Sequence, residues 1–192
     1  MFLLVAMLML ASPADVVISE IMYNPDGTSM GPDELMEWVE LHYGGEETLN
    51  LRGMSISDGT NRLVLEDYLI QPGDYVVVAA SAGAFIDLYG STVPMVEWTG
   101  EWTKLRNSGD TVSLYGPEGS LVETVTFLDS WGSGGDSGSP ADGDGSTLER
   151  IDLEGGTEES NWASSEDWDY RIVSSGNPLC WGTPGERNSR RR

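Results

Sequence analysis

Two side chains of this 192-residue chain have the chemistry of a hydrolytic site: Ser137 and His42. A serine hydroxyl attacks a carbonyl group only when a nearby base takes its proton and backbone N–H groups bind the oxyanion that forms. Ser137 lies in residues 135–140 (GDSGSP), whose backbone N–H groups would bind such an oxyanion. His42 is the only histidine, so it is the only histidine base that the sequence offers.

The string GDSGSP resembles the segment around the nucleophile of chymotrypsin-like serine proteases. The surroundings of His42 do not fit that chemistry, because His42 ends an alternating run over residues 35–43 that predicts a position within a strand. The string also lies in a Gly-, Ser- and Asp-rich stretch, where six-residue matches arise from composition alone. We therefore expect no catalytic residues, and a serine protease that uses Ser137 stays an alternative function.

The metal ligands that the sequence offers are mainly carboxylates. One histidine and one cysteine, Cys180, do not make a conventional zinc site. Calcium prefers carboxylate and carbonyl oxygens, and Asp136, Asp142 and Asp144 lie close together in the sequence. The spacing of an EF-hand loop fails, because Leu153 stands where its last carboxylate should be. We expect weak calcium binding at most and no other cofactor; a calcium-dependent surface adhesion module is a second alternative.

The charge of the chain argues against one class of partner. The sequence contains 32 acidic and 10 basic residues, for a formal net charge of −22 at pH 7. Binding to nucleic acid draws its affinity mainly from Lys and Arg side chains that neutralise phosphates, so we expect no nucleic-acid partner. A single cysteine excludes an intramolecular disulfide, so the stability of the fold must come from packing.

The first fourteen residues are typical of an export signal. An apolar run of about ten residues leads to Ser12, Pro13 and Ala14, and this pattern predicts cleavage after Ala14. The run is shorter than the roughly 20 apolar residues of a membrane-spanning helix, and no second such run follows. We therefore expect a monomeric protein without a transmembrane segment, secreted, periplasmic or held at the cell surface.

Short runs that alternate between apolar and polar residues, separated by Gly and Pro turns, predict an all-β antiparallel sandwich. The expected strands cover residues 16–23, 35–43, 49–56, 62–66, 74–79, 111–115, 121–128 and 146–151. In the second of them, Leu35, Val39 and Leu41 share one face, while Trp38, Glu40 and His42 share the other. One helix is expected, at 82–89, where apolar residues recur at helical spacing.

The sequence predicts one β-sandwich domain over residues 15–188, between the signal-like residues 1–14 and a basic tail at 189–192. Residues 129–145 are almost entirely Gly, Ser, Asp and Pro, and this composition predicts a long flexible loop. Among the tryptophans, we expect Trp38 and Trp162 in the core and Trp131 and Trp168 at the surface.

A series of short segments resembles the lamin tail domain family, in the order of the family pattern. These segments are residues 20–25 (EIMYNP), 37–41 (EWVEL), 49–58 (LNLRGMSISD), 69–75 (LIQPGDY), 105–114 (LRNSGDTVSL), 146–150 (STLER), 161–163 (NWA) and 182–185 (GTPG). One departure follows Leu41, where His42, Tyr43 and two glycines replace the Asn-Pro turn of the pattern. The resemblance implies an immunoglobulin-like β-sandwich of the bacterial secreted type. It also implies a non-enzymatic interaction or tethering module whose partner is an unidentified protein or cell-surface component.

Overall fold

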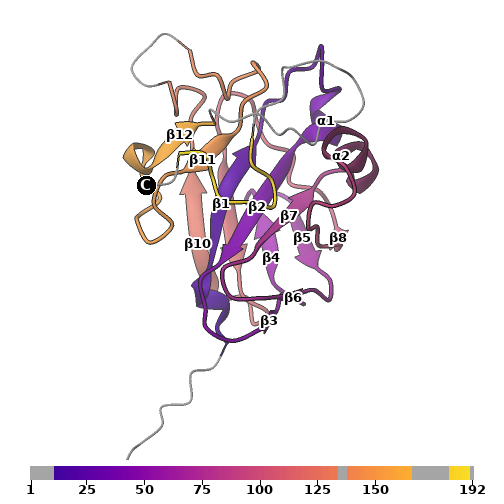
Figure 1. Cartoon of the computed structure of the whole chain (residues 1–192), viewed down its shortest axis with the longest axis vertical. Coiled ribbons are helices and arrows are strands. Elements are labelled where there is room, and N and C mark those ends of the chain that lie inside the picture. The colour runs from indigo at the N-terminus through magenta and orange to yellow at the C-terminus, as the bar shows by residue number, and fades with distance from the viewer. Residues whose placement is uncertain (1–10, 134–137, 166–181, 191–192) are drawn as a thin grey trace, which may run out of the picture.

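The computed structural model describes residues 11–133, 138–165 and 182–190, and within them two antiparallel five-stranded sheets pack face to face (Figure 1). The first sheet has the order β12 (Trp162–Ser164), β11 (Leu148–Arg150), β1 (Val16–Met22), β2 (Trp38–Tyr43) and β7 (Tyr75–Ala79). The second has the order β10 (Leu121–Thr126), β9 (Thr111–Tyr115), β4 (Ser55–Ser57), β5 (Arg62–Leu65) and β8 (Trp98–Gly100). A small pair joins β3 (Leu49–Asn50) to β6 (Leu69–Ile70). The prediction of an all-β antiparallel sandwich is confirmed.

The core between the sheets follows the predicted alternation in β2. Val39 and Leu41 point into the main core, whereas Trp38, Glu40 and His42 lie on the outer face of the first sheet. Leu35 does not belong to this strand as predicted, since it lies in a short helix, α1 (Asp33–Met36), and is 42% exposed. Pro32 precedes this helix and acidic residues occupy its first turn, a composition that favours a helix start over a strand.

The helix expected at 82–89 is present as α2 (Ala82–Tyr89). The Ser81 hydroxyl accepts a hydrogen bond from the Ala84 N–H at 3.3 Å and so caps its first turn. The buried face of α2 covers the outer face of the first sheet, where Phe85 and Tyr89 each meet Trp38 edge-on with ring centroids 5.9 Å apart. Among the described residues, no helix is long and apolar enough to cross a bilayer.

The chain enters the sandwich directly after the signal-like residues. Residues 1–10 lie outside the described part, and Ser12 caps a short 3-10 helix, η1 (Pro13–Asp15), just before β1. A second 3-10 turn, η2 (Glu159–Asn161), precedes β12. Three short strands, β6, β8 and β12, were not predicted, since two or three residues are too few to show an alternating pattern.

Residues 129–145 were expected to form a flexible loop, but residues on both sides of its undescribed part, 134–137, are buried in the domain. Trp131 is buried in the main core with 7% of its surface exposed, so the expectation that it lies at the surface is wrong. The Ser139 hydroxyl donates a 2.5 Å hydrogen bond to the Trp131 carbonyl oxygen, and Ala141 is fully buried. Serine side chains thus satisfy the backbone of this polar stretch while one tryptophan anchors it. Trp38 and Trp162 are buried as predicted, and Trp168 lies outside the described residues.

Candidate functional site

Three buried carboxylates form a row across the outer face of the first sheet: Glu149 on β11, Glu20 on β1 and Glu40 on β2. Glu20 is the cross-strand partner of both Glu149 and Glu40, and all three residues are fully buried. A register irregularity between Ile18 and Glu20 aims Glu20 outward, because strict alternation from Ile18 would turn it into the core. We call these three residues the carboxylate row.

The C-terminal residues 182–190 cover the carboxylate row and supply hydrogen-bond donors to it; Figure 1 draws their trace in yellow across the first sheet. The Thr183 N–H donates to Glu20 Oε1 at 3.1 Å, and the Gly185 N–H donates to Glu40 Oε2 at 2.5 Å. Gly185 has φ +81°, and a Cβ there would lie 2.7 Å from Pro94 Cδ. Only glycine fits this backbone and this close approach. We call residues 182–190 the C-terminal strap.

The far end of the strap is fixed as well. The Ser189 hydroxyl and the Arg190 N–H donate to Glu149 Oε2 at 2.7 and 3.0 Å. The Asn188 side-chain amide donates to the Ser19 carbonyl oxygen at 2.8 Å and to the Arg150 carbonyl oxygen at 3.0 Å. The sequence predicted that the domain ends at residue 188 and that a basic tail follows. In the structure, Ser189 and Arg190 of this tail still pack on the domain, and residues 191 and 192 lie outside the described part.

Burial of like charges governs the protonation of the carboxylate row. Burial, followed by the charges of Glu149 and Glu40, raises the pKa of Glu20 well above its ordinary value. Burial also raises the pKa of Glu149, although hydrogen bonds from Ser189, Arg190 and Thr183 act in the opposite direction. Glu20 and Glu149 therefore keep a proton to a higher pH than an exposed glutamate does, and the row accepts hydrogen bonds from the strap.

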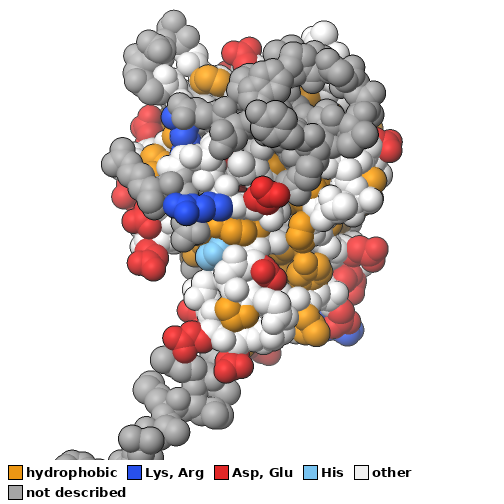
Figure 2. Space-filling view, viewed as in Figure 1, with side chains coloured by type: hydrophobic (Ala, Val, Ile, Leu, Met, Phe, Trp, Pro, Cys, Tyr) orange, Lys and Arg blue, Asp and Glu red, His pale blue; other side chains and the backbone are white. Residues whose placement is uncertain are grey.

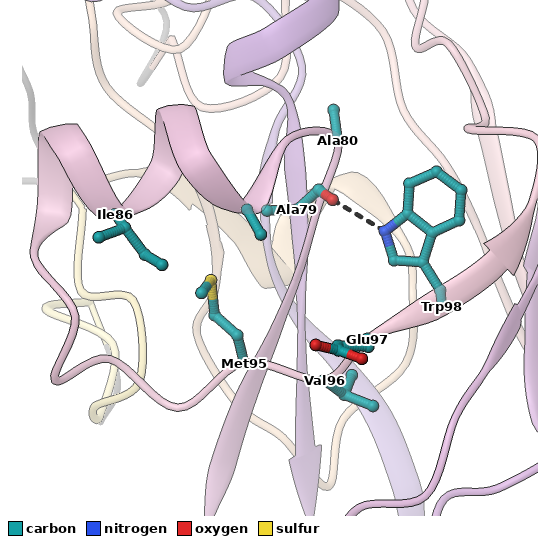
Figure 3. A pocket seen from close by; sticks show the side chains of 8 residues that line it. Ala79, Ala80, Ile86, Met95, Val96, Glu97 and Trp98 are labelled. Carbon is teal, nitrogen blue, oxygen red and sulfur yellow. Dashed lines mark hydrogen bonds between the residues drawn. The ribbon is translucent and has the colours of Figure 1, made fainter.

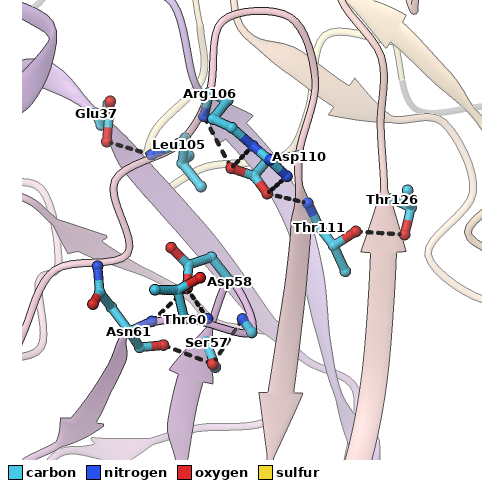
Figure 4. Close-up of polar contacts among 11 residues, drawn as sticks. Glu37, Ser57, Asp58, Thr60, Asn61, Leu105, Arg106, Asp110, Thr111 and Thr126 are labelled. Atoms are coloured by element: carbon cyan, nitrogen blue, oxygen red, sulfur yellow. Dashed lines mark hydrogen bonds and ion pairs between the residues drawn. The ribbon is translucent and has the colours of Figure 1, made fainter.

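A fourth carboxylate, Glu37, lies directly before β2 and accepts hydrogen bonds from the segment that follows β8. Its Oε2 accepts hydrogen bonds from Trp102 Nε1 at 2.7 Å and from the Leu105 N–H at 3.0 Å, and Figure 4 shows the second of these. Its Oε1 is buried and has no hydrogen-bond partner among the residues that the structure describes. Burial raises the pKa of Glu37 to about 7 despite the two donors. Close by, Arg106 pairs with Asp110 at 3.0 Å and Asp58 caps the turn after β4 (Figure 4).

An apolar groove lies where the edge strands β7 and β8 come together beneath α2 (Figure 3). Its volume is about 460 Å³, and its lining consists of Ala79, Ala80, Ala82, Ile86, Met95, Val96, Glu97 and Trp98. The Trp98 Nε1–H donates to the Ala79 carbonyl oxygen at 2.9 Å and so joins the two edge strands. Main-chain hydrogen bonds between Val77 and the loop before β8 hold Met95 in the wall of the groove. We call this hollow the α2–β8 groove.

The predicted calcium ligands are only partly placed by the structure. Asp142 Oδ1 accepts a 2.7 Å hydrogen bond from Asn24 Nδ2, Asp144 is exposed, and Asp136 lies outside the described residues. Within the described ranges, no group of three or more His, Cys, Asp or Glu side chains is arranged to hold a metal ion. Weak calcium binding at these three aspartates stays a prediction.

His42 lies within β2, as predicted. Its ring is 4.6 Å from the ring of Tyr75 on the neighbouring strand, and 8% of the residue is exposed. Ser137 lies outside the described residues.

Because a nucleophilic serine needs a base within about 3 Å, we expect a fluorophosphonate probe to leave the purified protein unlabelled. Ser137→Ala is expected to change the free energy of unfolding by less than about 0.5 kcal/mol. Stoichiometric labelling that both Ser137→Ala and His42→Ala abolish would establish the protease instead.

The carboxylate row and the groove were not singled out from the sequence, although a signal was present. Glu20, Glu37, Glu40, Glu149 and Thr183 all belong to the segments that carry the lamin-tail resemblance. Glu20, Glu40 and Glu149 each stand inside a strand beside at least one apolar residue, and a buried charge there requires a partner. The groove had no comparable signal, because its residues are mostly small or apolar and come from two separate stretches of the chain, 79–86 and 95–98.

Comparison with known proteins agrees with the fold. The Lamin Tail Domain family model matches residues 10–129, more than half of the chain. No curated protein matches the chain. Strands β11 and β12 and the C-terminal strap lie beyond the matched residues, yet β11 pairs with β1 and the strap bonds to the carboxylate row.

Proposed function

Since the chain belongs to the Lamin Tail Domain family, whose fold is an immunoglobulin-like β-sandwich, we propose that it is a non-enzymatic module that holds a partner protein in the α2–β8 groove. We further propose that it is exported, with residues 1–14 as the signal, and that it tethers its partner outside the cytoplasm. The apolar run and the small residues of its first fourteen positions support export.

The groove supports this proposal because it combines exposed apolar surface with the outer edge of β8, the last strand of its sheet, whereas β7 is already bonded at Val77 to residues 94–96. On α2, Phe85, Leu88 and Tyr89 pack against the sheet, whereas Ile86 stays 37% exposed at the rim of the groove. Alanines line one wall, so a partner's side chains find room there (Figure 3). Hollows of this size with apolar walls are usual binding sites, and strand edges bind extended segments through main-chain hydrogen bonds.

The charge of the protein indicates what kind of segment fits. Glu97 lines the groove, and Asp87 and Glu101 are exposed on the flanking elements. Figure 2 shows acidic side chains spread around one face of the molecule, with few Lys or Arg among them. Charge complementarity steers association and discriminates between partners. The occupant is therefore an extended partner segment in which apolar side chains alternate with lysine or arginine.

The test uses a fluorescent decapeptide that alternates leucine with lysine, and a second decapeptide with glutamate for lysine. We expect the lysine peptide to bind and the glutamate peptide not to bind. Ile86→Glu places a charge at the apolar rim of the groove and should weaken binding of the lysine peptide at least about tenfold.

The control is Leu121→Glu, which makes the same charge change on β10 at a residue that is 60% exposed. It should leave the affinity within about twofold of the wild type. Equal affinities for the wild type and Ile86→Glu, or equal losses in the two variants, would contradict the groove as the binding site.

A further inference from the structure

The Thr183 hydroxyl lies between two buried carboxylates. Its Oγ1 is 3.2 Å from Glu20 Oε2 and 3.1 Å from Glu149 Oε1. A hydroxyl group has one hydrogen to donate, so it can donate to only one of these oxygens at a time. Among the described residues, the other carboxylate oxygen then has a hydrogen bond to Thr183 only if it carries a proton and donates to the Thr183 oxygen.

A proton on Glu20 completes the arrangement. Glu20 Oε2 then donates to Thr183, and Thr183 donates to Glu149. The other oxygen, Oε1, still accepts hydrogen bonds from the Thr147 hydroxyl and from the Thr183 N–H. Without that proton, Glu20 and Glu149 are both ionised and fully buried, and Glu40 lies beside them. Like charges at such close range make the ionised form of each carboxyl less favourable.

The charged groups around the row come from several elements. The strap itself carries Glu186, Arg187 and Arg190, and Arg190 Nε donates to the Ser164 carbonyl oxygen of β12 at 2.7 Å. On the sheet, His42 and Tyr75 follow Glu40 on the same outer face. Arg150 turns away from the row, because its guanidinium pairs with Glu123 of β10 at 2.8 Å.

We propose that the C-terminal strap is a proton-dependent latch, docked on the first sheet while the carboxylate row holds a shared proton and released as that proton is lost at higher pH. Release exposes the outer face of β11, β1 and β2. It also removes the contact of Gly185 with Pro94, next to Met95 on the wall of the α2–β8 groove. The latch does not depend on the partner-binding proposal, because its parts all belong to this chain.

Hydrogen exchange of the full-length protein tests the latch, because the row accepts hydrogen bonds from the Thr183, Gly185 and Arg190 amides. After correction for intrinsic exchange rates, we expect the protection of these amides to fall at least about tenfold between about pH 5 and pH 8.5. They should exchange faster than the Val76 and Val78 amides of β7 throughout, which shows that the strap opens while the sandwich stays folded.

Glu20→Gln provides the decisive variant. Its side-chain amide can donate to Thr183 as a protonated carboxyl does, so we expect strap protection that no longer changes with pH. Glu118→Gln, at an exposed position in the turn between β9 and β10, should keep the wild-type response. Strap amides that exchange only together with those of β7, or protection that is independent of pH in the wild type, would overturn the proposal. The wild-type measurement alone decides the question if Glu20→Gln does not fold.

Discussion

The free energy of unfolding is expected to fall by on the order of 2–3 kcal/mol between about pH 5 and pH 8, so the protein should be more stable in mild acid than at neutral pH. Glu37 is expected to contribute most of this decrease, since burial raises its pKa from 4.5 to about 7. Glu20 and Glu149, whose pKa values are also raised by burial, act in the same direction.

The sign follows from proton binding. Between the pKa of an unfolded glutamate and the higher pKa of the buried one, the folded state binds more protons than the unfolded state. Stability is therefore greatest below the unfolded pKa and falls as the pH rises through the folded pKa. This trend is the reverse of the one produced by a carboxylate whose pKa is lowered by an ion pair.

Urea unfolding at constant ionic strength measures this dependence. Glu37→Gln keeps an acceptor for the Trp102 and Leu105 N–H groups but carries no charge. It should unfold with a free energy on the order of 2 kcal/mol above the wild type near pH 8 and should match it near pH 5. Glu118→Gln serves as the exposed control and should follow the wild-type curve. A stability that is flat or rises over this pH range would contradict the account of the buried glutamates.

Arg150→Ala is expected to destabilise the protein by about 3–5 kcal/mol, because it leaves the largely buried carboxylate of Glu123 without its partner. The Arg150 side chain is 2% exposed and pairs with Glu123, which is 12% exposed. It also donates to the Ile18 carbonyl oxygen at 3.3 Å and to the Gly155 carbonyl oxygen at 2.5 Å. Glu123 Oε2 accepts from the Ile18 N–H at 2.8 Å. The pair thus connects β10 of the second sheet to β1 and β11 of the first.

The matched control is Arg52→Ala, which removes an ion pair with Asp67 whose side chains are 66% and 59% exposed. Exposed pairs contribute little, so we expect a loss of no more than about 1 kcal/mol. The double variant Arg150→Met with Glu123→Leu should lose less stability than Arg150→Ala, since no charge then remains buried. Similar decreases in the free energy of unfolding for Arg150→Ala and Arg52→Ala, measured by thermal or urea unfolding, would show that the Arg150–Glu123 pair contributes no more stability than an exposed pair.

The strands and α2 could be predicted because their signals are local. Val39 and Leu41 alternate with Trp38 and Glu40 in the sequence as they do across the sheet, and Ser81 caps the helix expected at 82–89. Leu35 continued the same alternation by chance, and the proline before α1 proved the stronger signal.

The site could not be predicted in the same way, because it depends on pairing between distant segments. Glu20 and Glu149 meet only through the pairing of β1 with β11, and the irregularity after Ile18 decides which way Glu20 points. Composition misled at Trp131, since a Gly- and Ser-rich stretch can still place one large apolar side chain in the core. A single polar segment does not reveal which neighbours satisfy its backbone, and here Ser139 does so.

Binding of a partner segment in the α2–β8 groove is tested by mapping where a photoreactive form of the leucine–lysine decapeptide attaches to the protein. We expect adducts on the α2–β8 groove, at Ala82, Ile86, Met95 or Trp98, and we expect these adducts to be lost in Ile86→Glu but not in Leu121→Glu. Two results would contradict binding in the groove: adducts spread over the acidic surface, or adducts concentrated at other exposed apolar residues such as Leu69 or Leu121.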